Sequence, residues 1–324
     1  MKFLPDKLLC FLILAVIAAS IAPISGALEV WFSLATKLMI ALLFFFQGAK
    51  LPRQAVVAGM LHWRLHTVVF IVTFIIFPLF GIFIGLAIPN LKESPFYMGI
   101  LYLCVLPSTI QSSSAFTSIA GGNVPAAIVS ASISNLLGLV ITPLWVFILF
   151  NTAQGSTFLS TGTIKSIFFQ LFLPFLIGQI MQRRVGGFIK KHQSWTASIN
   201  LIAIIMVVYL SFCQAMNGGL WRQISWHDLS IVIFVDIGLL ALIVTLNWWG
   251  AKLLRFNRSD RIAITFCGSK KSLGGGVSMA NILFSGIDTI GTIIIPVMFF
   301  YQIQLMVCSV IARALSKGIP PDAE

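Results

Sequence analysis

The chain has 324 residues, of which 58% are hydrophobic and 9% are charged, and its mean hydropathy is +1.00. A soluble globular domain carries about 25% charged residues, so this composition excludes one and indicates an integral membrane protein. The net charge of +12 comes from basic residues spread over short loops, which favours a topology signal over nucleic-acid binding. The apolar runs lack the alternation of porin strands, so we expect helical spans.

Apolar segments long enough to cross a bilayer follow one another along the whole chain. A helical span needs about 20 apolar residues. In chain order the predicted spans lie near 8–25, 29–48, 67–89, 96–120, 125–150, 164–182, 196–216, 229–251, 261–285 and 290–312. Lys2 and Lys7 before the first run resemble a signal peptide, but the membrane pattern continues directly, so we interpret 8–25 as a retained span. The prediction is one all-α membrane unit over residues 1–324 with ten transmembrane helices.

Basic residues in the loops test that number of spans. With ten spans and both termini in the cytoplasm, most loop lysines and arginines fall on the cytoplasmic side. Lys92, Lys165 and Arg222 are the basic loop residues that fall on the other side. This bias predicts a multi-pass plasma-membrane protein, in the inner membrane of a bacterium, with both ends cytoplasmic.

The chain also divides into two related halves of five spans. Residues 45–48 (Phe-Phe-Gln-Gly) end the second span, and residues 212–215 (Phe-Cys-Gln-Ala) end its counterpart, the seventh. The fourth and ninth spans are each interrupted by a polar motif, at residues 107–114 and 267–276. Because five is odd, the second half runs in the opposite sense. Inverted repeats with paired broken helices are typical of secondary transporters.

Polar side chains inside the predicted spans are candidates for a substrate or ion cavity. A lysine at the centre of a membrane helix costs roughly 2.5–3.5 kcal/mol, so the adjacent lysines of the ninth span need a partner or water. Asp236 is the acid available at membrane depth, and we expect it to pair with Lys270, Lys271 or Lys37. The predicted cavity residues are Gln111, Ser112, Ser113, Ser114, Asn123, Ser130, Ser134, Asp236, Ser269, Lys270, Lys271 and Ser272.

Several of these residues have a structural alternative. Asn123, two residues before Pro125, suits a helix N-cap. Ser130 and Ser134 share one helical face and equally suit close helix packing. Lys37 can extend its ammonium to an interface. The sequence contains no paired carboxylates at useful spacing, no histidine-rich metal site and no Walker motif, so we predict neither an enzyme nor a cofactor.

Five motifs give the chain a family resemblance that runs nearly end to end. They are residues 44–51 (FFFQGAKL), 63–66 (WRLH), 120–124 (AGGNV), 266–273 (FCGSKKSL) and 279–284 (MANILF). Through them the chain resembles the sodium/bile acid symporter family, and more closely its divergent branch in bacteria with one orphan vertebrate member.

The resemblance implies a division into two domains with an organic anion bound between them. The implied panel domain holds the spans near 8–25, 29–48, 164–182 and 196–216. The implied core domain holds the spans near 67–89, 96–120, 125–150, 229–251, 261–285 and 290–312. The fourth and ninth helices would cross at their breaks.

The ninth span departs from the sodium-coupled members of that family. Those members carry Glu-x-x-x-Gln-Asn-Ser-Gly, whose glutamate and glutamine ligate sodium. This chain has Phe266 at the glutamate position, Lys270 at the glutamine position and Lys271 at the asparagine position.

The fourth and fifth spans also differ from that sodium-coupled pattern. On the fourth, the Ser-Asn pair of the family meets Ser113 and Ser114, or residues 112 and 113 if one residue is deleted; these are the candidate residual sodium ligands. On the fifth, the sodium-binding hydroxyls fall near Ala127 and Ala131, unless the register shifts to residues 130 and 134.

These departures predict altered or absent sodium coupling, because an ammonium close to a sodium ion opposes its binding. The expected function is alternating-access transport of an organic anion, either bile-acid-like or another small amphipathic anion, with sodium or a proton as the open coupling ions. The alternatives are a sodium-coupled bile acid symporter and a non-transporting regulatory or assembly protein. The expected partners are the anion and the lipid bilayer; a homo-oligomer stays open.

Overall fold

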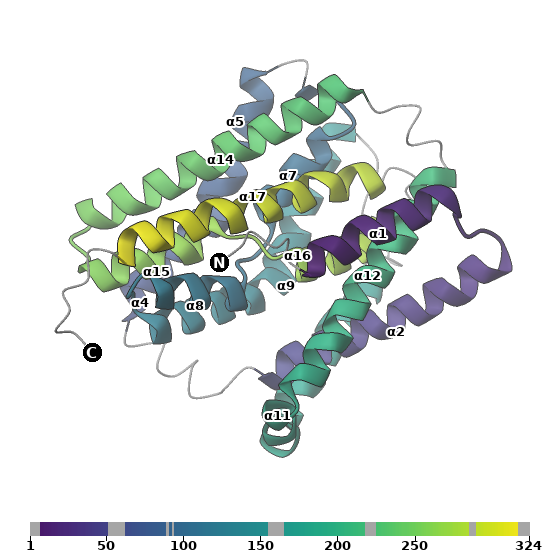
Figure 1. Ribbon diagram of the computed structural model, residues 1–324, viewed down its shortest axis with the longest axis horizontal. Coiled ribbons are helices and arrows are strands. Elements are labelled where there is room, and N and C mark those ends of the chain that lie inside the picture. Colours follow the sequence, from purple (N-terminus) through teal and green to yellow (C-terminus); the bar gives the residue numbers. More distant parts are fainter. Residues whose placement is uncertain are drawn as a thin grey trace. The chain divides into compact units, whose positions relative to one another are not determined.

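The computed structural model describes residues 7–50, 62–88, 91–92, 94–154, 165–217, 225–284 and 290–316, and the regular elements in these ranges are all helical (Figure 1). The α-helices are α1 (Lys7–Ile21), α2 (Ala27–Lys50), α4 (Trp63–Ile71), α5 (Phe77–Ala87), α7 (Tyr97–Val105), α8 (Ile110–Ile119), α9 (Val124–Gln154), α11 (Leu173–Lys191), α12 (Gln193–Asn217), α14 (Trp226–Leu253), α15 (Arg258–Ser269), α16 (Leu273–Leu283) and α17 (Ile290–Ser316). Two π-helical turns, η2 (Val72–Ile76) and η3 (Phe168–Phe172), precede α5 and α11. The all-α prediction is confirmed for this part of the chain.

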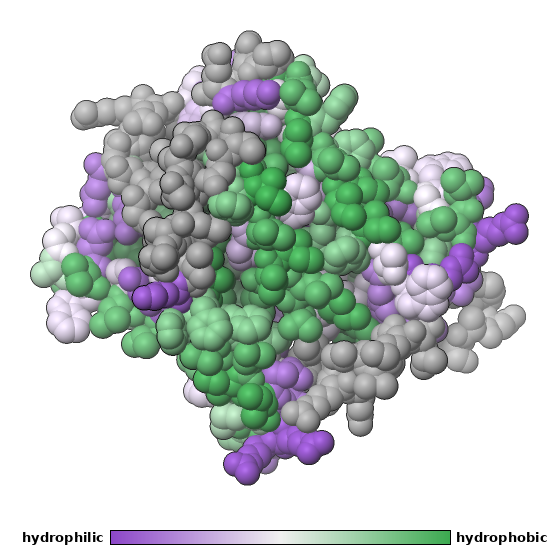
Figure 2. Space-filling model, turned by 180° about the vertical axis from the view of Figure 1, so that it is seen from behind, coloured by the Kyte–Doolittle hydropathy of each residue, from purple (hydrophilic) through white to green (hydrophobic). Residues whose placement is uncertain are grey.

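Within these ranges, six helical segments are long and apolar enough to cross a membrane. They are Ala27–Lys50, Trp63–Ala87, Val124–Phe150, Gln193–Asn217, Trp226–Leu253 and Ile290–Ser316, and each overlaps one predicted span. Apolar side chains accordingly make up much of the surface seen in Figure 2. The predicted spans near 96–120 and 261–285 are each divided into two short helices, so neither half is a full span alone.

The observed helices at the first and sixth predicted spans end at other residues than predicted. The helix at the first predicted span ends at Ile21 rather than at residue 25, because Pro23 removes a backbone donor. At the sixth, the helix continues beyond residue 182 to Lys191, because glutamine and arginine have a high helix propensity. Residue 164, and Lys2 and Arg222 from the topology prediction, lie outside the described residues.

The described helices belong to two compact units. The first comprises Met1–Pro52, Ala153–Ser225 and Gly274–Ile294, and the second comprises Arg53–Thr152, Trp226–Leu273 and Ile295–Glu324. In the first unit α11 packs along α2 and α1 packs along α12 (Figure 1). The Tyr209 hydroxyl donates to the carbonyl of Ala22 at 3.1 Å, which fixes the end of α1 against α12.

Two glycines allow α2 and α11 to approach closely. A Cβ at Gly178 would collide with the carbonyl oxygen of Phe45, and a Cβ at Gly48 would collide with that of Phe175. Small residues at a helix interface let two backbones approach in this way in membrane proteins.

We expect Gly178→Leu to destabilise the protein by at least about 1–3 kcal/mol, because its neighbour is rigid backbone. The measurement is thermal unfolding of the purified protein in detergent. Gly187→Leu is the matched control on α11, since nothing lies within 4 Å of a Cβ there. Equal losses for the two variants would contradict the close contact.

Candidate functional site

Two breaks in helical segments lie in the second unit and contact each other. Between α7 and α8 the chain is non-helical from Leu106 to Thr109, and between α15 and α16 it is non-helical from Lys270 to Ser272. The Ser272 amide donates to the Pro107 carbonyl at 3.0 Å. The Ser108 hydroxyl donates to the Cys267 carbonyl at 2.7 Å. Each break therefore supplies hydrogen-bond partners for the other.

Helix α9 stabilises the break that Pro107 creates. The residue before a proline is disfavoured in a helix, and Leu106 is accordingly extended. The Ser108 amide then donates to the Ser134 hydroxyl at 3.0 Å, and the Asn135 amide donates to the Ser108 carbonyl at 2.6 Å. Gly138 leaves room for the ring, because a Cβ there would lie 2.7 Å from a Pro107 carbon. The polar stripe of α9 thus replaces the lost helical bonds.

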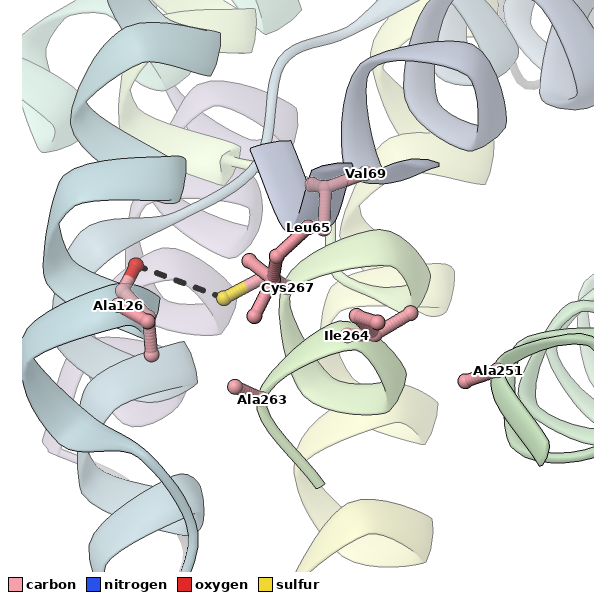
Figure 3. Packing of buried hydrophobic residues seen from close by; sticks show 8 residues of the cluster. Leu65, Val69, Ala126, Ala251, Ala263, Ile264 and Cys267 are labelled. Carbon is pink, nitrogen blue, oxygen red and sulfur yellow. Dashed lines mark hydrogen bonds between the residues drawn. The ribbon is translucent and has the colours of Figure 1, made fainter. Parts of the chain in front are cut away.

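Helix α15 is held beside α4, α9 and α14 by small apolar contacts (Figure 3). Cys267 points toward α9, and its thiol donates to the Ala127 carbonyl at 3.5 Å. Ala127 belongs to this buried cluster. Ala127 is therefore an apolar packing position.

Lys271 is buried within the second unit, and its ammonium is fully coordinated by backbone. Nζ donates to the carbonyls of Thr73 at 3.1 Å, Cys104 at 2.9 Å and Leu106 at 2.8 Å. It also lies 4.0 Å from the centroid of the Phe77 ring, an arrangement that favours a cation. A lysine ammonium has three N–H donors, so three carbonyls match the protonated side chain.

Two prolines make these carbonyls available. In the π turn of η2 the Phe77 amide donates to Val72, not to Thr73, and Pro78 has no amide hydrogen to offer in its place. The freed Thr73 carbonyl accepts from Lys271.

Pro107 has a corresponding effect at the end of α7. Because the helix ends at Val105, the Cys104 and Leu106 carbonyls lie at its C-terminus, where the helix dipole favours a cation. Both broken or distorted helices therefore present acceptors to the same ammonium.

Gln304 of α17 holds the backbone of the break at Lys271. The Lys271 amide donates to Gln304 Oε1 at 2.9 Å, and Gln304 Nε2 donates to the Lys271 carbonyl at 2.9 Å. Gln304 is fully buried. Sequence reasoning did not select it, although a glutamine inside an apolar span was the signal that could have found it.

Lys270 is also buried but has a different environment. Its Nζ lies 4.0 Å from the centroid of the Phe116 ring on α8. Among the described residues no oxygen accepts a hydrogen bond from this ammonium. The two adjacent lysines thus differ chemically, since the Lys271 ammonium is saturated by acceptors and the Lys270 ammonium has donors to spare.

Asp236 on α14 does not make the expected ion pair. Its side chain is completely buried, and within the described part of the chain neither carboxylate oxygen has a hydrogen-bond partner. The predicted pairing with Lys270 or Lys271 is wrong, because backbone carbonyls satisfy one lysine and an aromatic ring faces the other. Lys37, the third suggested partner, belongs to the other unit and makes no ion pair with a described residue.

The predicted residues of α8 have mixed roles. Gln111 is exposed, and the Ser114 hydroxyl donates back to the Ile110 carbonyl at 2.8 Å. The Ser113 hydroxyl reaches α15 and donates to the Phe266 carbonyl at 3.3 Å. The Ser112 hydroxyl oxygen is buried without a partner in the described chain. Ser113 is the member of this group that directly joins the two broken segments.

Of the remaining predicted residues, Asn123 and Ser269 make hydrogen bonds that stabilise helices. Asn123 caps α9, because its Oδ1 accepts from the Ala126 amide at 3.0 Å while its Nδ2 donates to Asp260 at 2.8 Å. The Ser269 hydroxyl donates to the Thr265 carbonyl at 2.6 Å. The Ser130 hydroxyl is buried and has no partner among the residues described. The alternative of a helix cap is therefore confirmed for Asn123.

Known proteins provide the context for this arrangement. The model of the SBF-like CPA transporter family matches residues 6–317. The chain is 44% identical to a Pseudomonas aeruginosa protein named "Uncharacterized protein PA2026", over 98% of this chain and 94% of that protein. It is 43% identical to the Escherichia coli protein named "Putative symporter YfeH", over 95% of this chain and 92% of that protein.

A more distant similarity reaches vertebrates. The chain is 26% identical to sodium/bile acid cotransporter 7-B of Xenopus laevis, over 94% of this chain and 90% of that protein. The family model and these relatives cover nearly the whole chain, and the described helices include several apolar enough to span a membrane. The chain is therefore a multi-pass membrane protein that belongs to the SBF-like CPA transporter family, a family of transporters and not of enzymes.

Proposed function

We propose that this protein is a secondary transporter of an organic anion that operates without sodium. The observation that carries the proposal is the coordination of the Lys271 ammonium by three backbone carbonyls at the contact between two broken helices. Oxygen ligands of this kind are those that a bound sodium ion would require. The side chain supplies the positive charge that an exchangeable ion supplies in sodium-coupled carriers.

A sodium ion beside this lysine would be strongly disfavoured. Two unit charges 4 Å apart repel by about 4 kcal/mol at an effective dielectric constant of 20. The three carbonyls already accept hydrogen bonds, and Phe266 and Ala127 offer apolar side chains where sodium-coupled relatives carry ligands. The Lys271 ammonium thus supplies a positive charge to the site and occupies the carbonyls that a sodium ion would need.

The proposal includes an alternating-access architecture. Ten transmembrane helices would form two inverted five-helix repeats, with both termini cytoplasmic in a bacterial inner membrane. The breaks at residues 106–109 and 270–272 support it, since they interrupt the corresponding fourth and ninth spans. The first compact unit gathers α1, α2, α11 and α12, the helices of the proposed panel, together with α16 and the start of α17.

The test is uptake of labelled organic anions into proteoliposomes that contain the purified protein. We expect accumulation or exchange at equal rates when sodium is replaced by choline. Sodium-dependent uptake would overturn the proposal in favour of a sodium symporter. If no anion from a broad panel binds or moves, the alternative of a non-transporting membrane protein on the same fold is favoured.

Asp236 provides a separate prediction about coupling. An unpaired carboxylate is very unfavourable in a buried site, so this position tolerates the neutral acid best. Asp236→Asn should therefore unfold within about 1 kcal/mol of wild type, while uptake loses its response to an imposed proton gradient. Asp228→Asn, at a partly exposed position of the same helix, is the control and should retain that response. A large loss of stability in Asp236→Asn would show that the carboxylate has a charged partner.

A further inference from the structure

A second polar site lies within the first compact unit, apart from the lysines of the breaks. It is a cavity of about 180 Å³. The polar residues that line it are Ser33, Lys37, Ser166, Gln170, Gln214 and Asn281. The two remaining lining residues are aliphatic. All of these residues belong to one unit, so the cavity is a property of that unit alone.

Lys37 gives the cavity its charge. It lies near the middle of α2, a helix apolar enough to cross a membrane, where a lysine needs water or a counter-ion. No acidic side chain of the described residues forms an ion pair with it, and it is the single ionisable side chain among those lining the cavity. Glu29, on the same helix, accepts a hydrogen bond from Gln214 at 3.2 Å instead. The lining therefore contains one cationic side chain, that of the exposed residue Lys37, without a direct ion pair in the described chain.

One residue of the cavity lining has an unused hydrogen-bond acceptor. Gln170 Oε1 is buried and has no partner in the described chain. Gln170 lies in the π turn η3, and Pro174 four residues later has no amide hydrogen for the Gln170 carbonyl. Such turns are frequent at functional sites. An acceptor without a donor inside a polar cavity is suited to a ligand that carries a hydroxyl group.

We propose that this cavity binds a small hydroxycarboxylate, with its carboxylate on Lys37 and a hydroxyl on Gln170. This inference rests on the proposed function and specifies the substrate class of the transporter. The cavity is smaller than the pockets of about 300–1,000 Å³ that enclose drug-sized ligands. Its lining is mostly amide and hydroxyl, whereas a steroid anion needs an extended apolar surface. The occupant is therefore a short, hydrophilic anion and not a bile acid.

The test is calorimetric binding to the purified full-length protein in detergent. The probes are glycerate and gluconate, with propionate as the carboxylate lacking hydroxyls, glycerol as the neutral analogue and taurocholate as the steroid anion. We expect at least one hydroxycarboxylate to bind more tightly than propionate, and glycerol and taurocholate not to bind. Absence of binding by both hydroxycarboxylates, or tighter binding of taurocholate, would overturn the inference.

Variants locate the binding within the cavity. Loss of a charge-assisted contact predicts that Lys37→Met weakens binding by about 10- to 100-fold, and that Lys37→Arg retains most of it. Gln170→Leu should remove the preference for the hydroxylated acid over propionate, a change that a general loss of packing would not produce. Lys92→Met, at an exposed position outside the cavity, is the control. Unchanged affinity in Lys37→Met places the ligand elsewhere and refutes the site.

Transport measurements separate this inference from the function on which it rests. Binding that depends on Lys37, without uptake into proteoliposomes, would refute the proposed transport function and support the cavity as a binding site. Uptake that is unaffected by Lys37→Met would support the proposed transport function and refute the cavity as the binding site. Unfolding temperatures of the ligand-free variants establish that each is folded.

Discussion

Replacing Lys271 with methionine is expected to destabilise the protein by roughly 3–5 kcal/mol and to abolish transport. The change leaves three buried carbonyls without a donor, and each buried polar group left unpaired costs about 1–3 kcal/mol. The measurement is thermal or denaturant unfolding in detergent, together with uptake into proteoliposomes.

The neighbouring lysine is the matched control for this prediction. Lys270→Met removes a buried ammonium that has no hydrogen-bond acceptor in the described chain, so we expect it to be neutral or stabilising. The two variants differ by one position in the same break. Equal destabilisation by both would show that the carbonyl contacts contribute nothing particular to Lys271.

A small cation adds a direct chemical test. Lys271→Ala should recover part of its unfolding temperature in millimolar methylammonium, which carries three N–H donors, and not in tetramethylammonium, which carries none. Recovery by sodium in place of methylammonium would show that the three carbonyls form a sodium site once the lysine is removed. Recovery by neither cation would contradict the view that a cation is what the site requires.

The second large effect is expected at Gln304. Gln304→Leu removes both side-chain hydrogen bonds to the Lys271 backbone and leaves a buried amide and a buried carbonyl unpaired. Each unpaired group costs about 1–3 kcal/mol, so we expect a loss of about 2–6 kcal/mol, measured by unfolding in detergent.

The same helix provides the control for Gln304. Gln302 Oε1 is buried without a hydrogen-bond partner among the described residues, so Gln302→Leu should be neutral or stabilising. A comparable loss in both variants would attribute the effect to the apolar packing of α17, and the reciprocal contact with Lys271 would then be unimportant.

The sequence was sufficient to predict the breaks but not the groups that surround them. A membrane helix is destabilised by a proline such as Pro107 and by the lysines and glycines of residues 267–276. Both interruptions could therefore be predicted from the sequence. The structure shows interruptions at both places. The number of spans stays a prediction, because among the described residues the fourth and ninth predicted spans are each divided into two short helices.

The ion pair of Asp236 was the principal error, and its cause is physical. The prediction assumed a charged side chain opposite each lysine, whereas backbone carbonyls stabilise the Lys271 ammonium, which keeps its charge. Every residue has a backbone carbonyl, so the residue types alone do not show which carbonyls are free to accept a hydrogen bond. Pro78 was the available signal, because a proline inside a span frees carbonyls in the preceding turn. The cavity at Lys37 was missed for a similar reason, since its lining comes from four separated segments.

The covalent attachment of the Lys271 charge has a consequence for the energetics of transport. A sodium ion crosses the membrane with its substrate and can cancel or exceed the negative charge that is moved. A lysine side chain stays with the protein, so each monovalent anion would cross with its charge uncompensated unless a proton accompanies it. Moving one charge against a membrane potential of 100 mV requires about 2.3 kcal/mol. In a cell whose interior is negative, this favours release of the anion to the outside, and uptake would require a proton as its companion.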